Sequence, residues 1–183
     1  MPLYTGTGDD GSTGLSDNQR VGKDDLRVET YGSVDEANSQ IGMLRTETLP
    51  ANLDAALAKV QRTLFEIGAD LATPGSNAAL PAIRAGISDI EDWIDSSEAE
   101  LPQLQSFVLP GGHREAAQFH LARSTVRRAE RLFWSLHRRD ETTTEPGVYL
   151  NRLSDLLFTW ARLANHRHGV ADVPWIPAQD GEV

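Results

Sequence analysis

The strongest chemical signal in the sequence is a run of arginines in the segment ARSTVRRAERLFW, residues 122–134. Helical spacing places Arg123, Arg127 and Glu130 on one face, because residues four and seven positions apart are one and two turns away. Any single arginine can pair with a carboxylate of its own molecule. As a set in an acidic chain they favour a multiply charged anion, since guanidinium groups bind phosphate oxygens through two parallel hydrogen bonds.

A glycine-rich stretch, TGTGDDGSTGL at residues 5–15, is the second candidate for phosphate binding. It departs from a P-loop, because Ser12 stands where the lysine is needed and no apolar strand precedes it. Small residues still let backbone N–H groups approach phosphate oxygens closely. Lys23 could supply the missing cation, and hydroxyl donors come from Thr5, Thr7, Ser12 and Thr13. A flexible tail is the alternative interpretation of this stretch.

Two further polar groups give weaker signals. Asn151 and Asp155 lie one turn apart in YLNRLSDLLF, where a solvated or capping role is the alternative to a functional one. Asp35 and Glu36 are adjacent, so they do not share a helix face and make a poor acid–base pair. Neither group indicates a reaction by itself.

The metal-ligating residue types are sparse. Cysteine is absent, which excludes disulfides, thiolate catalysis and cysteine-based zinc or iron–sulfur sites. The five histidines include no Glu-x-x-His repeat of a di-iron bundle, so a ferritin-like oxidase is disfavoured. His166 and His168 are interpreted as surface or helix-end residues, and no metal ligand is assigned.

The charge balance and hydropathy exclude several classes of protein. The net charge is −10, with two lysines against fifteen arginines, so the surface as a whole repels nucleic acid. No apolar run approaches the roughly 20 residues of a membrane span, and the N-terminus lacks the features of a signal peptide. We therefore expect a cytoplasmic protein without a nucleic-acid or membrane partner.

The apolar periodicity predicts helices that position these residues. Ser33 is the expected N-cap of the first helix, with Glu36 completing a capping box, and Gly169 is the expected C-terminal cap of the last. The predicted helices cover residues 33–45, 52–72, 83–94, 113–139 and 147–168. No strand pattern is convincing. The sequence predicts an all-α, up-and-down five-helix bundle in a single domain: an N-terminal loop region 1–32, a bundle 33–170 and a tail 171–183.

Taken together, the motifs resemble one known family. TGTGDDGSTGL, RVGKDDLRVETYGSVDEANSQIG, FVLPGG, ARSTVRRAER and YLNRLSDLLF occur in the order and spacing of the PduO-type ATP:corrinoid adenosyltransferases, from about residue 4 to residue 168. The resemblance implies a five-helix bundle of the ferritin or cobalamin-adenosyltransferase type that assembles as a homotrimer. It also implies that ATP lies between the N-terminal loop of one subunit and the arginine helix of its neighbour.

The resemblance also assigns roles to individual residues. The residues that would close over the phosphates are Thr5, Gly6, Thr7, Gly8, Ser12, Thr13 and Lys23. The residues that would bind the rest of the nucleotide are Arg127, Arg128, Glu130, Arg131 and Asn151, with Glu130 near the sugar and base. Arg123 would pair with Asp35 across the interface, and Phe107 would sit at the lower face of the corrin ring. Gly6 and Ala37 depart from the family pattern, in which a longer residue and a leucine are common.

The implied reaction transfers the 5′-deoxyadenosyl group of ATP, with Mg²⁺, to the Co(I) of a reduced corrinoid and releases triphosphate. The nucleophile is the reduced cobalt, which suits a chain without cysteine. The implied partners are a reductase and an adenosylcobalamin-dependent enzyme. Two alternatives stay open: a binding module that senses or delivers ATP and adenosylcobalamin, and a structural adaptor whose arginines dock an acidic partner.

Overall fold

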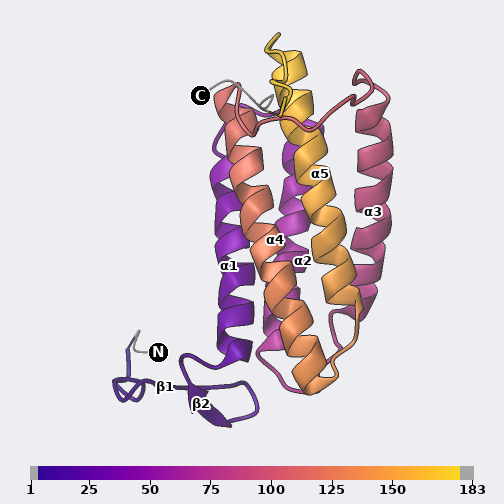
Figure 1. The fold of residues 1–183 in the computed structure, drawn as a ribbon. Helices are drawn as coiled ribbons and strands as arrows, with labels where there is room; N and C mark the ends of the chain where they lie inside the picture. The colour runs from indigo at the N-terminus through magenta and orange to yellow at the C-terminus, as the bar shows by residue number, and fades with distance from the viewer. Residues whose placement is uncertain (1–3, 178–183) are drawn as a thin grey trace.

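The computed structural model describes residues 4–177, which form a bundle of long helices with a small β-hairpin at one end (Figure 1). The helices are α1 (Leu26–Leu44), α2 (Ala51–Leu71), α3 (Leu80–Glu98), α4 (Arg114–Asp140) and α5 (Glu145–Arg167). The predicted all-α five-helix bundle is confirmed. None of the helices in this part of the chain is long and apolar enough to cross a membrane.

The helix α4 lies between α1 and α5, and it packs along both of them (Figure 1). Its inner stripe is fully buried at Phe119, Val126 and Phe133. Facing side chains of α1 and α5, including Ile41 and Leu157, belong to the same apolar core. Burial of each such side chain contributes about 1.5–3 kcal/mol, so the register of α4 against its neighbours is firmly set.

The start of α1 differs from the sequence prediction. The helix begins at Leu26 rather than Ser33, because Asp25 is the N-cap and accepts a hydrogen bond from the Arg27 N–H at 2.7 Å. Ser33 lies inside the helix and is buried. The capping-box interpretation of Ser33 and Glu36 is therefore wrong, and residues 26–32, which were assigned to the N-terminal loop region, are helical.

The N-terminal loop region contains two short strands that the sequence analysis did not predict. The strands β1 (Ser12–Gly14) and β2 (Arg20–Gly22) pair antiparallel, with Thr13 opposite Val21. Strands of this length are too short to show an alternating apolar pattern. The Ser16 N–H donates to the Ala72 carbonyl at 3.0 Å, and Leu15 is buried, so the hairpin is attached to the end of α2.

The tail after α5 returns across the end of the bundle. Gly169 has a positive φ of 67° directly after the helix, as expected for a C-terminal cap. The Leu109 N–H donates to the Val173 carbonyl at 2.8 Å, and the Trp175 N–H donates to the Phe107 carbonyl at 2.7 Å. The tail therefore packs on the segment that precedes α4. Residues 1–3 and 178–183, which include the end of the predicted tail 171–183, lie outside the described residues.

A buried ion pair joins the start of α1 to the end of α4. The Arg27 side chain donates to the Leu71 carbonyl at 2.7 Å and to Asp140 Oδ2 at 2.6 Å, and the residue is only 6% exposed. Hydrogen bonding to Arg139 and to Arg27 lowers the pKa of Asp140. This contact holds α1, α2 and α4 together beside the hairpin.

We expect Arg27→Met to destabilise the fold by about 2–4 kcal/mol, because it leaves the Leu71 carbonyl without its side-chain donor and removes one of the two guanidinium partners of the partly buried Asp140. Arg84→Met is the matched control, since the Arg84–Glu145 pair is largely exposed at Arg84 and should change stability by less than about 1 kcal/mol. Urea unfolding at one fixed protein concentration measures both. Equal losses in the two variants would contradict the special role of Arg27.

Candidate nucleotide and corrinoid site

Three arginines of α4 present unpaired guanidinium groups along one side of the helix. We call Arg123, Arg127 and Arg131 the arginine face. Arg127 and Arg131 are exposed, whereas Arg123 is half-buried and its Nε is enclosed without a hydrogen-bond acceptor. Within residues 4–177 none of the three makes an ion pair. Burial lowers the pKa of Arg123, and the charge of Arg127 lowers it further, so the face has an excess of positive charge.

Arg128 behaves differently from the arginine face. Its guanidinium donates to Ser33 Oγ at 3.0 Å and pairs with the carboxylate of Glu36, and Glu29 lies 3.9 Å away. Pairing with carboxylates of the same molecule, the alternative considered for any single arginine, is therefore realised here. Arg128 fastens α4 to α1 in this structure, and its contact with a nucleotide stays a prediction.

Glu130 and Asn151 come together across α4 and α5. The Asn151 side-chain amide donates to Glu130 Oε1 at 3.2 Å, and the Arg152 guanidinium donates to Asn151 Oδ1 at 3.0 Å. The structure thus places this pair beside the arginine face, since Glu130 lies one turn of α4 after Arg127 and is next to Arg131 in the sequence. Asp155 stays exposed and unpaired among the described residues.

The predicted phosphate loop forms a compact, hydrogen-bonded unit. Arg20 donates to the Thr7 carbonyl at 2.6 Å and contacts Ser12 Oγ. Asp10 accepts from both the N–H and the hydroxyl of Ser12, and these bonds lower the pKa of Asp10. The hydroxyls of Thr5 and Thr7 lie 2.9 Å apart. The stretch is therefore a structured hairpin rather than an irregular tail.

Lys23 and Gly8 meet inside this hairpin. A Cβ on Gly8 would lie 2.9 Å from the Ser12 carbonyl oxygen and 3.4 Å from Lys23 Nζ, so only glycine fits without a shift. The Lys23 ammonium thus stands beside the glycine backbone, as the sequence analysis expected of the missing cation. Gly6 adopts a positive φ of 71°, and Thr13 lies in β1.

The hairpin and the arginine face do not meet within one chain. The hairpin projects beyond the N-terminal end of α1, to the side of the bundle (Figure 1). Among residues 4–177 no hydrogen bond or ion pair joins residues 4–23 to Arg123, Arg127, Arg128 or Arg131. Asp35 likewise lies exposed on α1 without an ion-pair partner in this part of the chain.

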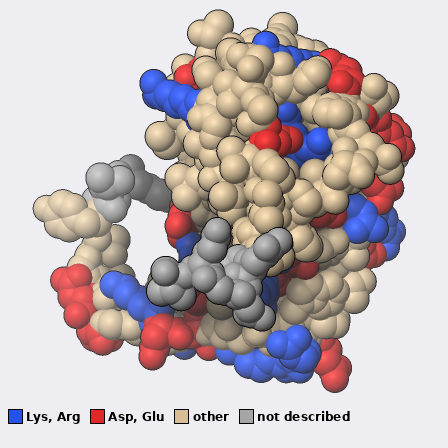
Figure 2. Space-filling model, turned by 45° about the horizontal axis from the view of Figure 1, so that its top comes forward, with Lys and Arg blue, Asp and Glu red and all other residues tan. Residues whose placement is uncertain are grey.

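The end of the bundle near the tail presents an apolar surface. Phe107 is 79% exposed, so its ring does not belong to the bundle core. Figure 2 shows that uncharged side chains dominate this end, with charged residues gathered mainly towards its edges. Ser106 and Val108, the neighbours of Phe107 in the sequence, line a cavity of about 310 Å³ between the 101–106 segment and the tail.

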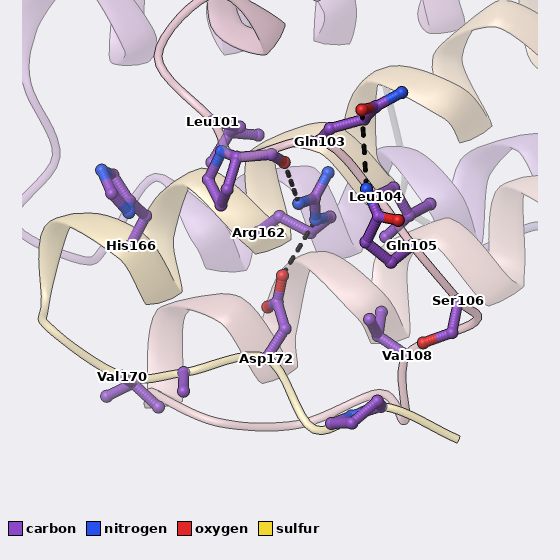
Figure 3. A pocket seen from close by; sticks show the side chains of 13 residues that line it. Leu101, Gln103, Leu104, Gln105, Ser106, Val108, Arg162, His166, Val170 and Asp172 are labelled. Atoms are coloured by element: carbon purple, nitrogen blue, oxygen red, sulfur yellow. Dashed lines mark hydrogen bonds and ion pairs between the residues drawn. The ribbon is translucent and has the colours of Figure 1, made fainter. Parts of the chain in front are cut away.

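The cavity is built around a buried arginine (Figure 3). Arg162 donates to the Pro102 carbonyl at 2.9 Å and to Asp172 Oδ2 at 2.9 Å. Its charge is therefore neutralised by Asp172 of the same chain. The other side chains that line the cavity are both polar and apolar. The pair fixes the 101–106 segment to the tail behind Phe107.

Sequence reasoning missed several residues that shape the site. Arg20 holds the hairpin, Arg152 orients Asn151, and His120 lies on the same stripe of α4 as Arg123 and Arg127. His120 is 4% exposed, its Nδ1 has no partner, and burial, followed by the charge of Arg123, lowers its pKa. His120 precedes Arg123 by three residues and Arg127 by seven, and this helical spacing could have indicated that it lies on the same side of α4.

Comparisons with known proteins agree with this geometry. A sequence model of the cobalamin adenosyltransferase family matches residues 3–164. A cobalamin adenosyltransferase of Cupriavidus metallidurans is 47% identical over 174 residues, covering 94% of this chain and 93% of that protein. A corrinoid adenosyltransferase of Mycobacterium tuberculosis is 45% identical over 185 residues, covering 97% and 94%.

Solved structures give the same result. A variant of the PduO-type ATP:corrinoid adenosyltransferase from Lactobacillus reuteri, complexed with cobalamin and ATP, has a TM-score of 0.86 at 33% identity, covering 95% of this chain and 99% of that one. Another variant of that enzyme, complexed with ATP, has a TM-score of 0.88 at 33% identity, covering 95% and 100%. The chain belongs to the cobalamin adenosyltransferase family.

Proposed function

We propose that this chain transfers the 5′-deoxyadenosyl group of ATP to the Co(I) of a reduced corrinoid, forming the adenosylated corrinoid and releasing triphosphate. The observation that carries the proposal is the arginine face, where three guanidinium groups stand unpaired beside Glu130 and Asn151. A multiply charged anion is the ligand that such a face suits best. Family membership supplies the chemistry that the anion undergoes.

The phosphate-binding role rests on charge. Negative charge develops on the departing triphosphate, and donors fixed before the reaction stabilise it without reorganising. Arg127 and Arg131 provide guanidinium donors. The hairpin provides Lys23, backbone N–H groups next to Gly6 and Gly8, and the hydroxyls of Thr5, Thr7, Ser12 and Thr13. Glu130 and Asn151, already paired, offer an acceptor and a donor for the sugar and base.

Mg²⁺ accompanies this anion in the proposal. The ion usually keeps several waters and binds through one or two carboxylates together with substrate phosphates. The triphosphate oxygens and water supply ligands of this kind, and no residue of the chain is assigned to the ion. When bound, Mg²⁺ neutralises part of the triphosphate charge.

The corrinoid side of the proposal rests on Phe107 and on Arg123 with Asp35. The reduced cobalt is the nucleophile, so the protein has to position the two substrates rather than supply a nucleophilic side chain. Reduction of Co(II) is easier when no ligand occupies its lower face, and an exposed aromatic ring beside that face excludes such a ligand. The 79% exposure of Phe107 leaves the ring available for this contact.

Separation of the hairpin from the arginine face supports a homotrimer with sites between subunits. The hairpin of one subunit would close over the nucleotide held by α4 of its neighbour, and Asp35 would meet Arg123 across the same interface. A cytoplasmic location, a reductase that delivers the electron and an adenosylcobalamin-dependent enzyme that takes the product complete the proposal.

Arg127→Ala should lower the rate of adenosylation by a hundredfold or more, because one charged contact to the leaving group is worth about 3 kcal/mol. The measurement is anaerobic, with ATP, Mg²⁺ and chemically reduced cob(I)alamin followed by the visible spectrum. Arg138→Ala is the control, since this exposed arginine of α4 donates only to Ser135 Oγ. If the wild type binds ATP without turnover, the chain is a sensing or delivery module instead. If it binds no ATP, a structural adaptor is favoured.

Mixed trimers test whether the site lies between subunits. Lys23→Ala and Arg127→Ala chains should each be nearly inactive alone, whereas trimers assembled from both should regain activity at about a quarter of their interfaces. An Arg127→Ala and Arg131→Ala mixture is the control, because both lesions lie on the same helix and every interface keeps one of them. No recovery in the first mixture, with trimers present, would place the whole site in one chain.

Phe107→Ala should impair adenosylation while leaving the affinity for ATP nearly unchanged, because its ring faces the corrinoid and not the nucleotide. Turnover is followed as above, and ATP affinity is measured by calorimetry without corrinoid. Leu104→Ala, an exposed apolar residue on the same end of the bundle, is the control. Unchanged turnover in the Phe107 variant would remove this residue from the mechanism.

A further inference from the structure

Three metal-ligating side chains converge at the junction of α4 and α5, outside the site described above. They are His113, the N-cap of α4; Glu115, in its first turn; and His168, the C-cap of α5. One ligand atom from each lies within 4.8 Å of the other two, and no other such group of three occurs within residues 4–177. The cluster is about 12 Å along α4 from Arg123, given the helical rise, so it is separate from the arginine face.

The cluster brings its donor atoms close together, with the two imidazole rings stacked rather than converging on one point. His168 Nε2 lies 3.1 Å from Glu115 Oε2, and the two imidazole rings stack with centroids 3.6 Å apart and planes 16° apart. Ligands of a tetrahedral zinc ion lie roughly 3.3 Å apart, given bonds of 2.0–2.2 Å. An ion binds an imidazole lone pair in the plane of the ring, so the stacked rings must turn as well as approach. His168, whose side chain is 43% exposed, has the freedom to move.

The surroundings fix the start of the cluster and leave its carboxylate without a guanidinium partner among the described residues. Asn165 Oδ1 accepts from the His113 N–H at 2.9 Å, which fixes the start of α4 against α5. Nearby guanidinium groups are engaged by other carboxylates: Arg114 by Glu47, Arg162 by Asp172 and Arg167 by Glu100. The Glu115 carboxylate, with its side chain 11% exposed, is thus left to face two imidazoles.

We propose that His113, Glu115 and His168 form a binding site for a divalent transition-metal ion of the zinc class. Two neutral imidazoles and one carboxylate are a donor set that zinc uses, with a fourth position left for water. The ion would replace the hydrogen bond between His168 and Glu115 and would also take the Nδ1 or Nε2 lone pair of His113. His113 Nδ1 accepts the Glu115 N–H at 3.3 Å, a long bond that costs little to give up.

A site here would clip the first turn of α4 to the last turn of α5. The 107–112 segment, which carries Phe107, leads directly into His113, and the tail leaves directly after His168. Zinc would therefore restrain both the 107–112 segment and the tail, which together form the end of the bundle that carries Phe107. A protonated His168 paired with Glu115, and no metal, is the competing explanation of the same contacts.

The test uses the untagged full-length chain, freed of metal by a chelator, without ATP or corrinoid. Calorimetric titration with Zn²⁺ should give one ion per chain, and Co²⁺ should produce the intense visible bands of a tetrahedral site. His168→Ala and His168→Gln should each weaken the affinity by more than about a hundredfold, since even residues that only orient ligands cost 10–100-fold. Zn²⁺ should raise the melting temperature of the wild type but not of the two His168 variants.

His166→Ala is the matched control, because it removes an exposed histidine two residues away that makes no contact with the cluster. It should bind Zn²⁺ as the wild type does. Absence of saturable Zn²⁺ binding by the wild type, or an equal loss in the His166 variant, would overturn the proposal and leave the ion pair as the explanation. ATP binding and turnover are measured separately, so failure here leaves the proposed function untouched.

Discussion

The site depends on how one helix, α4, divides its surface between the core and solvent. Its inner stripe is buried against α1 and α5, which fixes its rotation and its height in the bundle. With that rotation set, Arg127 and Arg131 face outward and Arg123 is half-buried. No loop has to order for these guanidinium groups to hold their spacing. Catalytic electrostatics of this kind work best on a rigid element, because the charges need not reorganise during the reaction.

The helices were predictable because each has an apolar stripe that persists for several turns. Leu53, Leu57, Val60 and Leu64 give α2 its period, and the same kind of pattern gives α3 and α5 theirs. The start of α1 was not predictable on this basis, since Arg27, Thr30 and Ser33 are buried polar residues. Arg27 and Ser33 are placed there by distant partners, Asp140 and Arg128, which lie 113 and 95 positions away in the sequence.

The candidate site was foreseen in its residues more than in its arrangement. The arginines and the glycine-rich stretch were identified from their types and spacing, and the family resemblance supplied their roles. What the sequence could not show is which arginine is already engaged: Arg128 binds Glu36, whereas Arg127, its neighbour, points elsewhere. A difference of one position on a helix turns the side chain by 100°, and only packing decides which direction meets a carboxylate.

The hydrogen bonds within the hairpin have a consequence for the thermodynamics of nucleotide binding. Arg20, Asp10 and Ser12 tie the glycine-rich backbone to itself, so much of the conformational entropy of this segment is lost when the chain folds. A loop that is ordered only by its ligand loses that entropy on binding, and its affinity falls accordingly. In this protein the glycines let the backbone approach the phosphates closely, while the hydrogen bonds of the hairpin remove the flexibility that glycines usually give. Weakening the hairpin would therefore reduce affinity even if every phosphate contact were kept.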